Sequence, residues 1–210
     1  KRVERVEEHE DVLSRTFLTN DGKRITYAEA VDGMTLRATE YMETMGVEES
    51  VRESVTADMK EELLKQHVEA EKRGLGDHGI RHIYGNFERG EAYLESRTDL
   101  SAEQKLAVLV SQVYHDEGYT LNENCLGTLH PGNSDKKHDE ASLTVWNDPG
   151  RRSMYGAVFS DKTMSSIQTA IGTHNSDDVQ AIQKNTAITA DPVVSTVHIC
   201  DKLALSQREK

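Results

Sequence analysis

Histidine and aspartate occur together at a place where the surrounding sequence is apolar. His115 and Asp116 follow the most apolar stretch of the chain, which ends at Tyr114. Burying an adjacent imidazole and carboxylate costs free energy unless a partner satisfies both groups. A divalent metal ion suits imidazole and carboxylate groups that converge in a dry site. The pair therefore favours a metal site, although hydrogen bonding at a helix end explains most isolated His-Asp pairs.

Two further residues extend this argument from other parts of the chain. Asp201 lies on the face of the last expected helix that also carries Val194 and Val197, where a carboxylate requires a cation. That cation is either a metal ion or a lysine or arginine from elsewhere in the fold. His82 lies on an earlier expected helix, and by itself it is equally consistent with a hydrogen-bonded histidine in the core.

The elements that must position these residues are helices. The chain has only three prolines, and its apolar residues recur mostly with helical rather than alternating spacing. A turn is expected at Asn20-Asp21-Gly22. Helices are expected over residues 27–45, 55–72, 78–94, 138–146 and 163–172, with further helices starting after Ser101 and at Asp191. The pattern predicts an all-α fold.

The helix that leads to His115 has the clearest signals. Ser101 and Gln104 form a capping-box sequence, and the residues that follow are apolar nearly all round the helix. We therefore expect this helix to be central and buried. Asp77, Asp135 and Asp191 are expected N-caps of other helices. The 210 residues suggest an N-terminal helical extension over 1–70, of unknown role, and a metal-binding helical domain over 71–210.

The order of these residues resembles the H…HD…D signature of the HD superfamily, whose members are all-α metal-dependent phosphohydrolases. Three local sequences carry the resemblance: DHGIRHI at residues 77–83, VYHDEGY at 113–119 and ICDKL at 199–203. Together they place it over residues 77–205. The resemblance implies an HD-domain-like helical bundle in which each ligand lies on its own helix.

The resemblance also implies roles for individual residues. It makes His78, one helical turn before His82, the general acid that protonates the leaving oxygen. It makes Asp116 the carboxylate that bridges two ions. In family members with two metals, histidines between the HD pair and the last aspartate bind the second ion. The implied metal ligands are His82, His115, Asp116, His138, His174 and Asp201.

The activity implied is cleavage of a phosphate ester or anhydride by a metal-activated water. The cofactor is one or two divalent ions, with manganese, iron, magnesium, cobalt, nickel and zinc all open, and the substrate is a nucleotide or small phosphorylated metabolite. The loop over residues 120–137 is a candidate wall of the pocket. Cations near the motifs that could meet phosphate are Arg81, Lys136, Lys137, Arg151, Arg152 and Lys202.

The chain departs from the family pattern at two positions beside the HD pair. Glu117 stands where an apolar residue is usual, so it either adds a carboxylate near the site or faces water. Tyr119 replaces the lysine of HDxGK members, which speaks against the cyclic-dinucleotide HD-GYP subgroup. Glu117 and Tyr119 thus mark what is particular to this chain.

Two other functions remain open on the same scaffold. Some HD-like proteins hold a di-iron centre with an H…HD…H…H…D ligand set and use dioxygen to oxidise a substrate, and this chain satisfies that set too. Others keep the fold as a ligand-binding or interaction module without catalysis. Such modules usually lose a ligand, whereas all four defining positions are present here.

The composition of the chain indicates which binding partners are excluded and in which cellular compartment the protein is expected. The formal net charge of −12 opposes broad binding to a phosphate backbone, although a metal can invert the local charge in one cleft. Cys125 and Cys200 are far apart, so we expect both to be reduced in a cytoplasmic protein. Residues 1–11 are charged, so no secretory signal is expected. No apolar run is long enough to cross a membrane. A homo-oligomer is possible.

Overall fold

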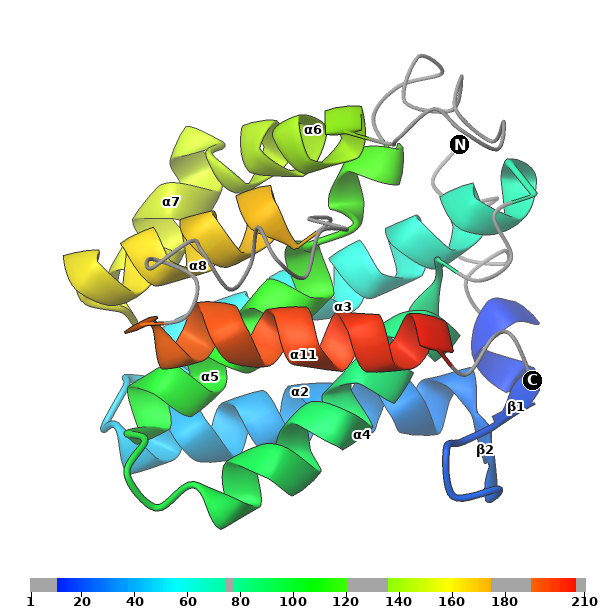
Figure 1. Ribbon diagram of the computed structural model, residues 1–210, viewed down its shortest axis with the longest axis horizontal. Helices are drawn as coiled ribbons and strands as arrows, with labels where there is room; N and C mark the ends of the chain where they lie inside the picture. Colours follow the sequence, from blue (N-terminus) through cyan, green and yellow to red (C-terminus); the bar gives the residue numbers. More distant parts are fainter. Residues whose placement is uncertain (1–10, 75–77, 121–135, 175–189, 207–210) are drawn as a thin grey trace.

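The computed structural model describes residues 11–74, 78–120, 136–174 and 190–206. Within these residues the protein is helical apart from one small hairpin, which confirms the expected all-α class (Figure 1). The helices in chain order are α2 (Tyr27–Thr44), α3 (Glu49–Lys72), α4 (Ile80–Ser96), α5 (Ala102–Tyr114), the 3₁₀ turn η1 (Glu117–Thr120), α6 (Lys136–Trp146), α7 (Pro149–Gly156), α8 (Asp161–Thr173) and α11 (Pro192–Ser206).

The hairpin precedes the first long helix. Strands β1 (Thr16–Leu18) and β2 (Arg24–Thr26) pair antiparallel, with Phe17 opposite Ile25. The expected turn lies between them, where Gly22 has a φ of 83° that a side-chain-bearing residue rarely adopts. Phe17 and Ile25 are both buried, so the hairpin closes one end of the core.

Side-chain caps set where several helices begin. Thr26 and Glu29 form a capping box at the start of α2, and Ser101 and Gln104 form the expected one at the start of α5. Asp191 accepts hydrogen bonds from the first backbone N–H groups of α11, as expected. The expected caps Asp77 and Asp135 lie outside the described residues.

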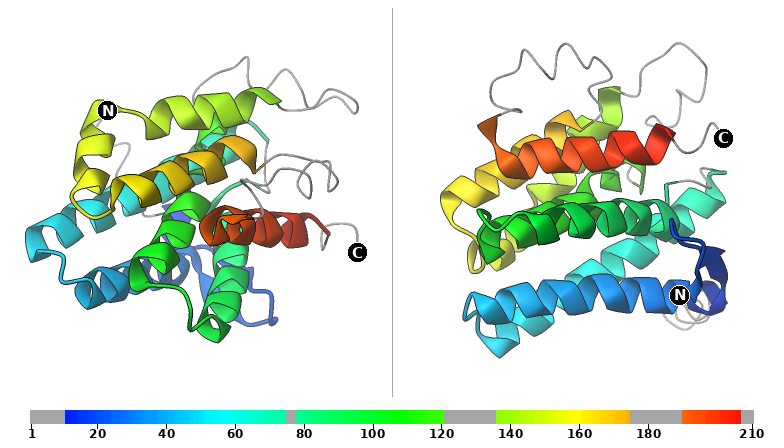
Figure 2. Two further views of the ribbon diagram at one scale, coloured as in Figure 1. Left: turned by 60° about the vertical axis from the view of Figure 1, so that its left-hand side comes forward. Right: turned by 60° about the horizontal axis from the view of Figure 1, so that its bottom comes forward.

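Helix α5 is the centre of the bundle, as predicted. It packs against α2, α3, α4, α8 and α11. The right-hand view of Figure 2 shows α11, α5 and α2 as successive layers. Every residue over 106–114 is at most 2 % exposed. This burial fixes the end of α5, and with it the backbone that leads into His115 and Asp116.

A single hydrophobic core includes residues from both parts of the chain that the expected boundary at residue 70 separates. It includes Val12, Met34 and Met59 from the N-terminal part together with Leu106 and Val197 from the rest. Helix α3 itself continues through residue 70. The N-terminal segment therefore packs directly on the helices that carry the predicted metal ligands.

Several helix boundaries differ from those expected, and one short helix is additional. Helix α3 begins at Glu49 instead of residue 55, because its first turns carry charged residues that give little apolar periodicity. Helix α4 begins at Ile80 instead of residue 78, with Gly79 as its N-cap. Helix α7 was not expected, since it has only 8 residues, yet Asp148 caps it and Pro149 opens it.

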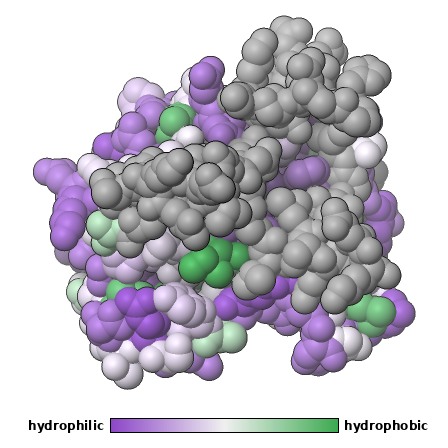
Figure 3. Space-filling model, viewed as in Figure 1, coloured by the Kyte–Doolittle hydropathy of each residue, from purple (hydrophilic) through white to green (hydrophobic). Residues whose placement is uncertain are grey.

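Where Figure 3 colours the surface, it is mainly hydrophilic, with a small apolar patch over α11. Ile199 on that helix is half exposed. Among the residues that the structure describes, no helix combines the length and the apolar character required to cross a membrane.

Candidate metal centre

The six predicted ligands come together around the C-terminal end of α5. All six are buried. Five separate elements deliver them: His82 from α4, His115 and Asp116 from the end of α5, His138 from α6, His174 from the end of α8, and Asp201 from α11. This convergence of buried histidine and aspartate could hold a metal ion. The role of each residue as a ligand stays a prediction.

The first half of the cluster joins His82, His115, Asp116 and Asp201. His82 Nε2 lies 3.3 Å from His115 Nε2 and 3.4 Å from Asp116 Oδ2. Asp201 Oδ1 lies 3.4 Å from His82 Nε2 and 3.7 Å from His115 Nε2. Two ligands ~2.1 Å from one tetrahedral ion are separated by about 3.4 Å. His82, His115 and Asp116 therefore have the spacing of ligands around a single ion, and Asp201 contacts the two histidines of this group.

The second half uses the other oxygen of Asp116. His138 Nε2 and His174 Nε2 lie 2.9 Å apart. Asp116 Oδ1 is 3.6 Å from the first and 3.3 Å from the second. Asp116 thus directs Oδ2 at one pair of histidines and Oδ1 at another. A carboxylate in that position can bridge two ions.

Two of the histidines are oriented by backbone carbonyl groups. His115 Nδ1 lies 2.8 Å from Gln112 O, and His174 Nδ1 lies 2.7 Å from Ile171 O. In each case Nδ1–H donates to the carbonyl, which leaves Nε2 with its lone pair facing the cluster when the ring is neutral. Ligating histidines are commonly held by such outer contacts.

The electrostatics of the cluster also call for a cation. Burial lowers the pKa of His115, but Asp116 and Asp201 outweigh it and hold that pKa well above its usual value. Burial raises the pKa of Asp116, yet the surrounding histidines bring it well below its usual range. The pKa of Asp201 is lowered for the same reason. Without metal, the cluster therefore retains a proton that a divalent ion would displace.

His78, the predicted general acid, lies at the edge of the cluster. It precedes α4 instead of lying within it, so the expected position one helical turn before His82 is wrong. Its ring still lies 5.8 Å from that of His82, and its Nδ1 is 3.1 Å from Asp116 Oδ2. The side chain of His78 is 24 % exposed, more than any of the six predicted ligands.

Tyr119 packs between His78 and His138. Its ring is stacked on that of His138 at 4.3 Å and lies 4.6 Å from that of His78. The backbone oxygen of Tyr119 accepts a hydrogen bond of 2.6 Å from Arg73. Tyr119 therefore forms an aromatic wall against His138 of the cluster and against His78 at its edge.

Gly118 allows η1 to pack directly on α6. A Cβ at this position would lie 2.1 Å from the backbone oxygen of His138 and 2.7 Å from the backbone nitrogen of Ser142. Gly118 N donates to Ser142 Oγ, which in turn donates to His115 O at 2.7 Å. This close contact sets the separation between the two halves of the cluster.

Sequence reasoning missed two polar residues at the cluster. Asn86, one turn after His82 on α4, places Nδ2 3.3 Å from His82 Nε2. Asp139 directs Oδ1 at His138 Nε2, 2.9 Å away. A signal for Asp139 was present in the sequence, because His138-Asp139 repeats the His115-Asp116 dipeptide.

The cations expected to meet phosphate have different surroundings. Arg151 is tied to buried carboxyl groups of Glu62 and Glu117, so it is committed to the interior. Glu117 is 0 % exposed and therefore does not face water. Arg81 is exposed and Arg152 is half-buried. Three of the expected cations have side chains outside the described residues: Lys136, Lys137 and Lys202. The same holds for the loop over residues 121–135.

The two cysteines were both expected to be reduced. Cys200 is a free, buried thiol, whereas Cys125 lies outside the described residues.

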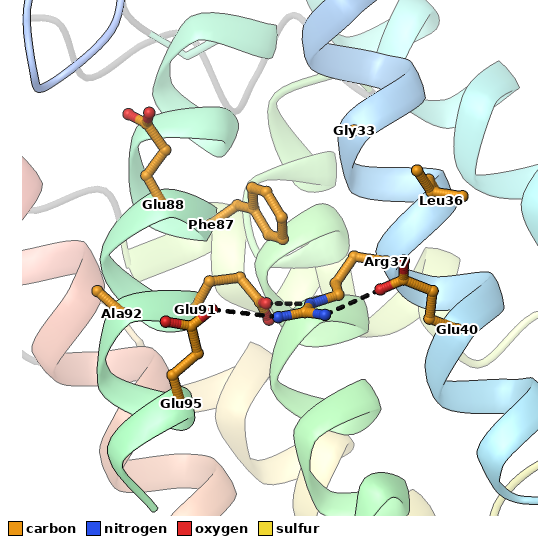
Figure 4. Close-up of a pocket in the computed structure, with 9 residues that line it drawn as sticks. All are labelled: Gly33, Leu36, Arg37, Glu40, Phe87, Glu88, Glu91, Ala92 and Glu95. Atoms are coloured by element: carbon orange, nitrogen blue, oxygen red, sulfur yellow. Dashed lines mark hydrogen bonds and ion pairs between the residues drawn. The ribbon is translucent and has the colours of Figure 1, made fainter.

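A groove between α2 and α4 is separate from the cluster (Figure 4). Its floor holds Arg37, which pairs with Glu40 and Glu91, and Leu36 and Phe87 line its sides. None of the predicted metal ligands lines it. Because its arginine is already paired with carboxylates, the groove offers no free cation for a phosphate.

The chain was also compared with known proteins. No protein family, no curated protein and no solved structure matches it. The case for its function therefore depends on the residues of the cluster and their geometry.

Proposed function

We propose that this protein is a metal-dependent phosphohydrolase of the HD type, which cleaves a phosphate ester or anhydride of a small phosphorylated molecule. The observation that carries the proposal is the position of Asp116 between two pairs of buried histidines. Its Oδ2 lies 3.3 Å from His115 Nε2, and its Oδ1 lies 3.3 Å from His174 Nε2. This is the geometry that the H…HD…H…H…D order of the sequence leads one to expect.

The residues divide the chemistry between them. When bound, divalent ions would lower the pKa of a water from ~16 to near 7 and neutralise phosphoryl charge. Asp116 spaces the two half-sites, and burial of the histidines excludes competing water. His78 can reach a substrate oxygen from its partly exposed position while Asp116 Oδ2 holds its Nδ1 at 3.1 Å. Protonation of the leaving oxygen is therefore assigned to His78.

The size and charge of the substrate follow from the surroundings. The net charge of −12 repels a long polyanion, so a small phosphorylated metabolite or nucleotide is favoured. The local cationic charge that attracts it would come from the ions, since Arg151 is occupied by Glu62 and Glu117.

The decisive experiment combines metal analysis with ligand variants. Elemental analysis of purified protein should find up to two transition ions per chain, and both His115→Ala and Asp116→Ala should lose them. Metal-loaded protein should then hydrolyse members of a panel of nucleotides and small phosphoesters. Glu140→Gln, which alters an exposed carboxylate on α6, is the matched control and should retain both metal and activity.

The same experiment separates the other two functions. Iron that resists exchange, together with oxygen uptake and no phosphate release, would indicate a di-iron oxygenase. Bound metal with neither activity would leave a non-catalytic module. Protein that binds no metal after exposure to manganese, iron, cobalt and zinc would contradict the proposal.

A further inference from the structure

We infer that Asp139 is a terminal ligand of the second ion, so that the two half-sites have the same ligand chemistry. The inference rests on the proposed two-metal centre and adds a residue that the H…HD…H…H…D order does not contain. Each ion would then have two histidine nitrogens, one terminal aspartate and one oxygen of Asp116. Asp201 is the terminal aspartate of the first half-site.

The position of Asp139 supports this role. Its Oδ1 lies 2.9 Å from His138 Nε2 and 3.7 Å from His174 Nε2. In the first half-site, Asp201 Oδ1 lies 3.4 and 3.7 Å from the two histidine nitrogens that it faces. The two carboxylates therefore occupy corresponding positions, and each is directed at a pair of Nε2 atoms.

The hydrogen-bonding state of Asp139 makes a cation the missing partner. Its Oδ1 is buried and has no hydrogen-bond partner, although His138 Nε2 is only 2.9 Å away. A buried carboxylate oxygen without a donor is costly. Asp139 lies in the first turn of α6, where a carboxylate also benefits from the helix dipole. The helix dipole would stabilise this carboxylate in any orientation. It therefore does not explain why Asp139 Oδ1 is buried and faces two histidines.

Proton counting leads to the same conclusion. His174 Nδ1 lies at hydrogen-bond distance from a backbone carbonyl, so a neutral ring would present a lone pair at Nε2. The facing oxygens of Asp116 and Asp139 are acceptors as well. His138 Nε2 can supply at most one proton, which cannot satisfy three acceptors at once. One divalent ion between the two histidines and Asp139 Oδ1 would satisfy these three atoms together, and Asp116 Oδ1 faces the same two histidines.

Matched ligand sets have a measurable consequence. Three carboxylates, on Asp116, Asp139 and Asp201, would accompany two divalent ions. Each half-site then has two nitrogen and two oxygen ligands, so the wild type should bind two ions with similar affinities. Removing one terminal carboxylate should weaken its own half-site and leave the other nearly unchanged.

The test is a titration of metal-free protein with Co²⁺, followed by calorimetry and by the visible absorption of the bound ion. Asp139→Asn removes the charge with little change in shape and should weaken one of the two sites by tenfold or more. Asp201→Asn should weaken the other. Glu140→Gln removes a neighbouring exposed carboxylate and should leave both sites intact. Thermal unfolding in chelator verifies that each variant folds. If Asp139→Asn fails to fold, Asp139→Ala takes its place in the titration.

The outcomes distinguish this inference from the proposed function. Two ions in the wild type and one weakened site in Asp139→Asn support both. Two ions bound equally well by wild type and Asp139→Asn would overturn the role of Asp139 while the metal centre stands. A wild type that binds one ion would overturn the inference alone. A wild type that binds none would overturn the metal centre and the inference with it.

Discussion

Arg151 contacts both carboxyl oxygens of Glu117 with a single nitrogen, Nη1, at 2.8 Å each. Nη2 of the same guanidinium lies 3.2 Å from Glu62, and its central carbon lies 4.6 Å from the centre of the Tyr114 ring. Glu117 directly follows Asp116 in the chain. The pair therefore anchors the turn that presents Asp116 to the candidate metal centre.

Replacing Arg151 should be strongly destabilising. Arg151→Ala would leave the buried carboxyl groups of Glu62 and Glu117 with only the partly exposed Lys65 as a cationic partner, and removing one member of a buried charged cluster typically costs about 3–5 kcal/mol. Urea denaturation in chelator measures the loss. Arg152→Ala, on the same helix, removes an arginine without an ion pair among the described residues and should cost much less. Equal losses in the two variants would contradict a special role for Arg151.

Glu117 should make stability depend on pH. Burial and the neighbouring Glu62 raise the pKa of Glu117 to about 9, although Arg151 acts in the opposite direction. The unfolded chain releases this proton near pH 4.5 and the folded chain keeps it, so the stabilisation is complete below pH 4.5 and is lost as the pH rises towards 9.

The corresponding variant is Glu117→Gln, which is neutral at every pH. Between pH 5.5 and 8.5 the free energy of unfolding of the wild type should fall more steeply than that of the variant, by up to about 1.4 kcal/mol per pH unit. Denaturant titrations in chelator at several pH values measure the difference. Parallel curves would show that Glu117 keeps an ordinary pKa in the folded protein.

His78 should affect turnover but not metal content. His78→Asn removes the proposed proton donor, and loss of a general acid typically lowers the rate about 10²–10⁴-fold. The ligand atoms of His82, His115 and Asp201 are untouched, so elemental analysis should find the wild-type amount of metal. Substrates with a good leaving group should lose much less rate than those with a poor one. A uniform loss across leaving groups would remove His78 from this role.

Metal binding should release a proton. Asp116 and Asp201 hold the pKa of His115 well above its usual value, so without metal His115 is protonated at neutral pH. An ion must displace that proton, and apparent affinity should therefore fall about tenfold for each pH unit below neutrality. Calorimetry in two buffers of different ionisation enthalpy counts the protons.

Removing the metal should lower the thermal stability of the protein. Chelator should lower the melting temperature, because the ions bind only the folded chain.

The amino-acid sequence alone determined the fold class and most residues of the candidate metal centre. The apolar run over residues 106–114 and the capping box at Ser101 predict a central helix, because full burial and a defined start are both local properties of the sequence. That helix must end near His115 and Asp116. Asp201 could be predicted in the same way, from a carboxylate on an apolar helix face.

Only the tertiary structure decided which oxygen faces which histidine. The division of Asp116 between two histidine pairs depends on how α6 and α8 approach α5, and Gly118 permits the close approach of α6. The buried ion pairs of Arg151 could not be predicted from the sequence either. The carboxyl groups that it contacts lie 34 and 89 residues away in the chain. Asp139 had a local signal, but its direction follows from the packing of three helices. Contacts between residues distant in sequence are set by the sum of many packing interactions, which local patterns do not encode.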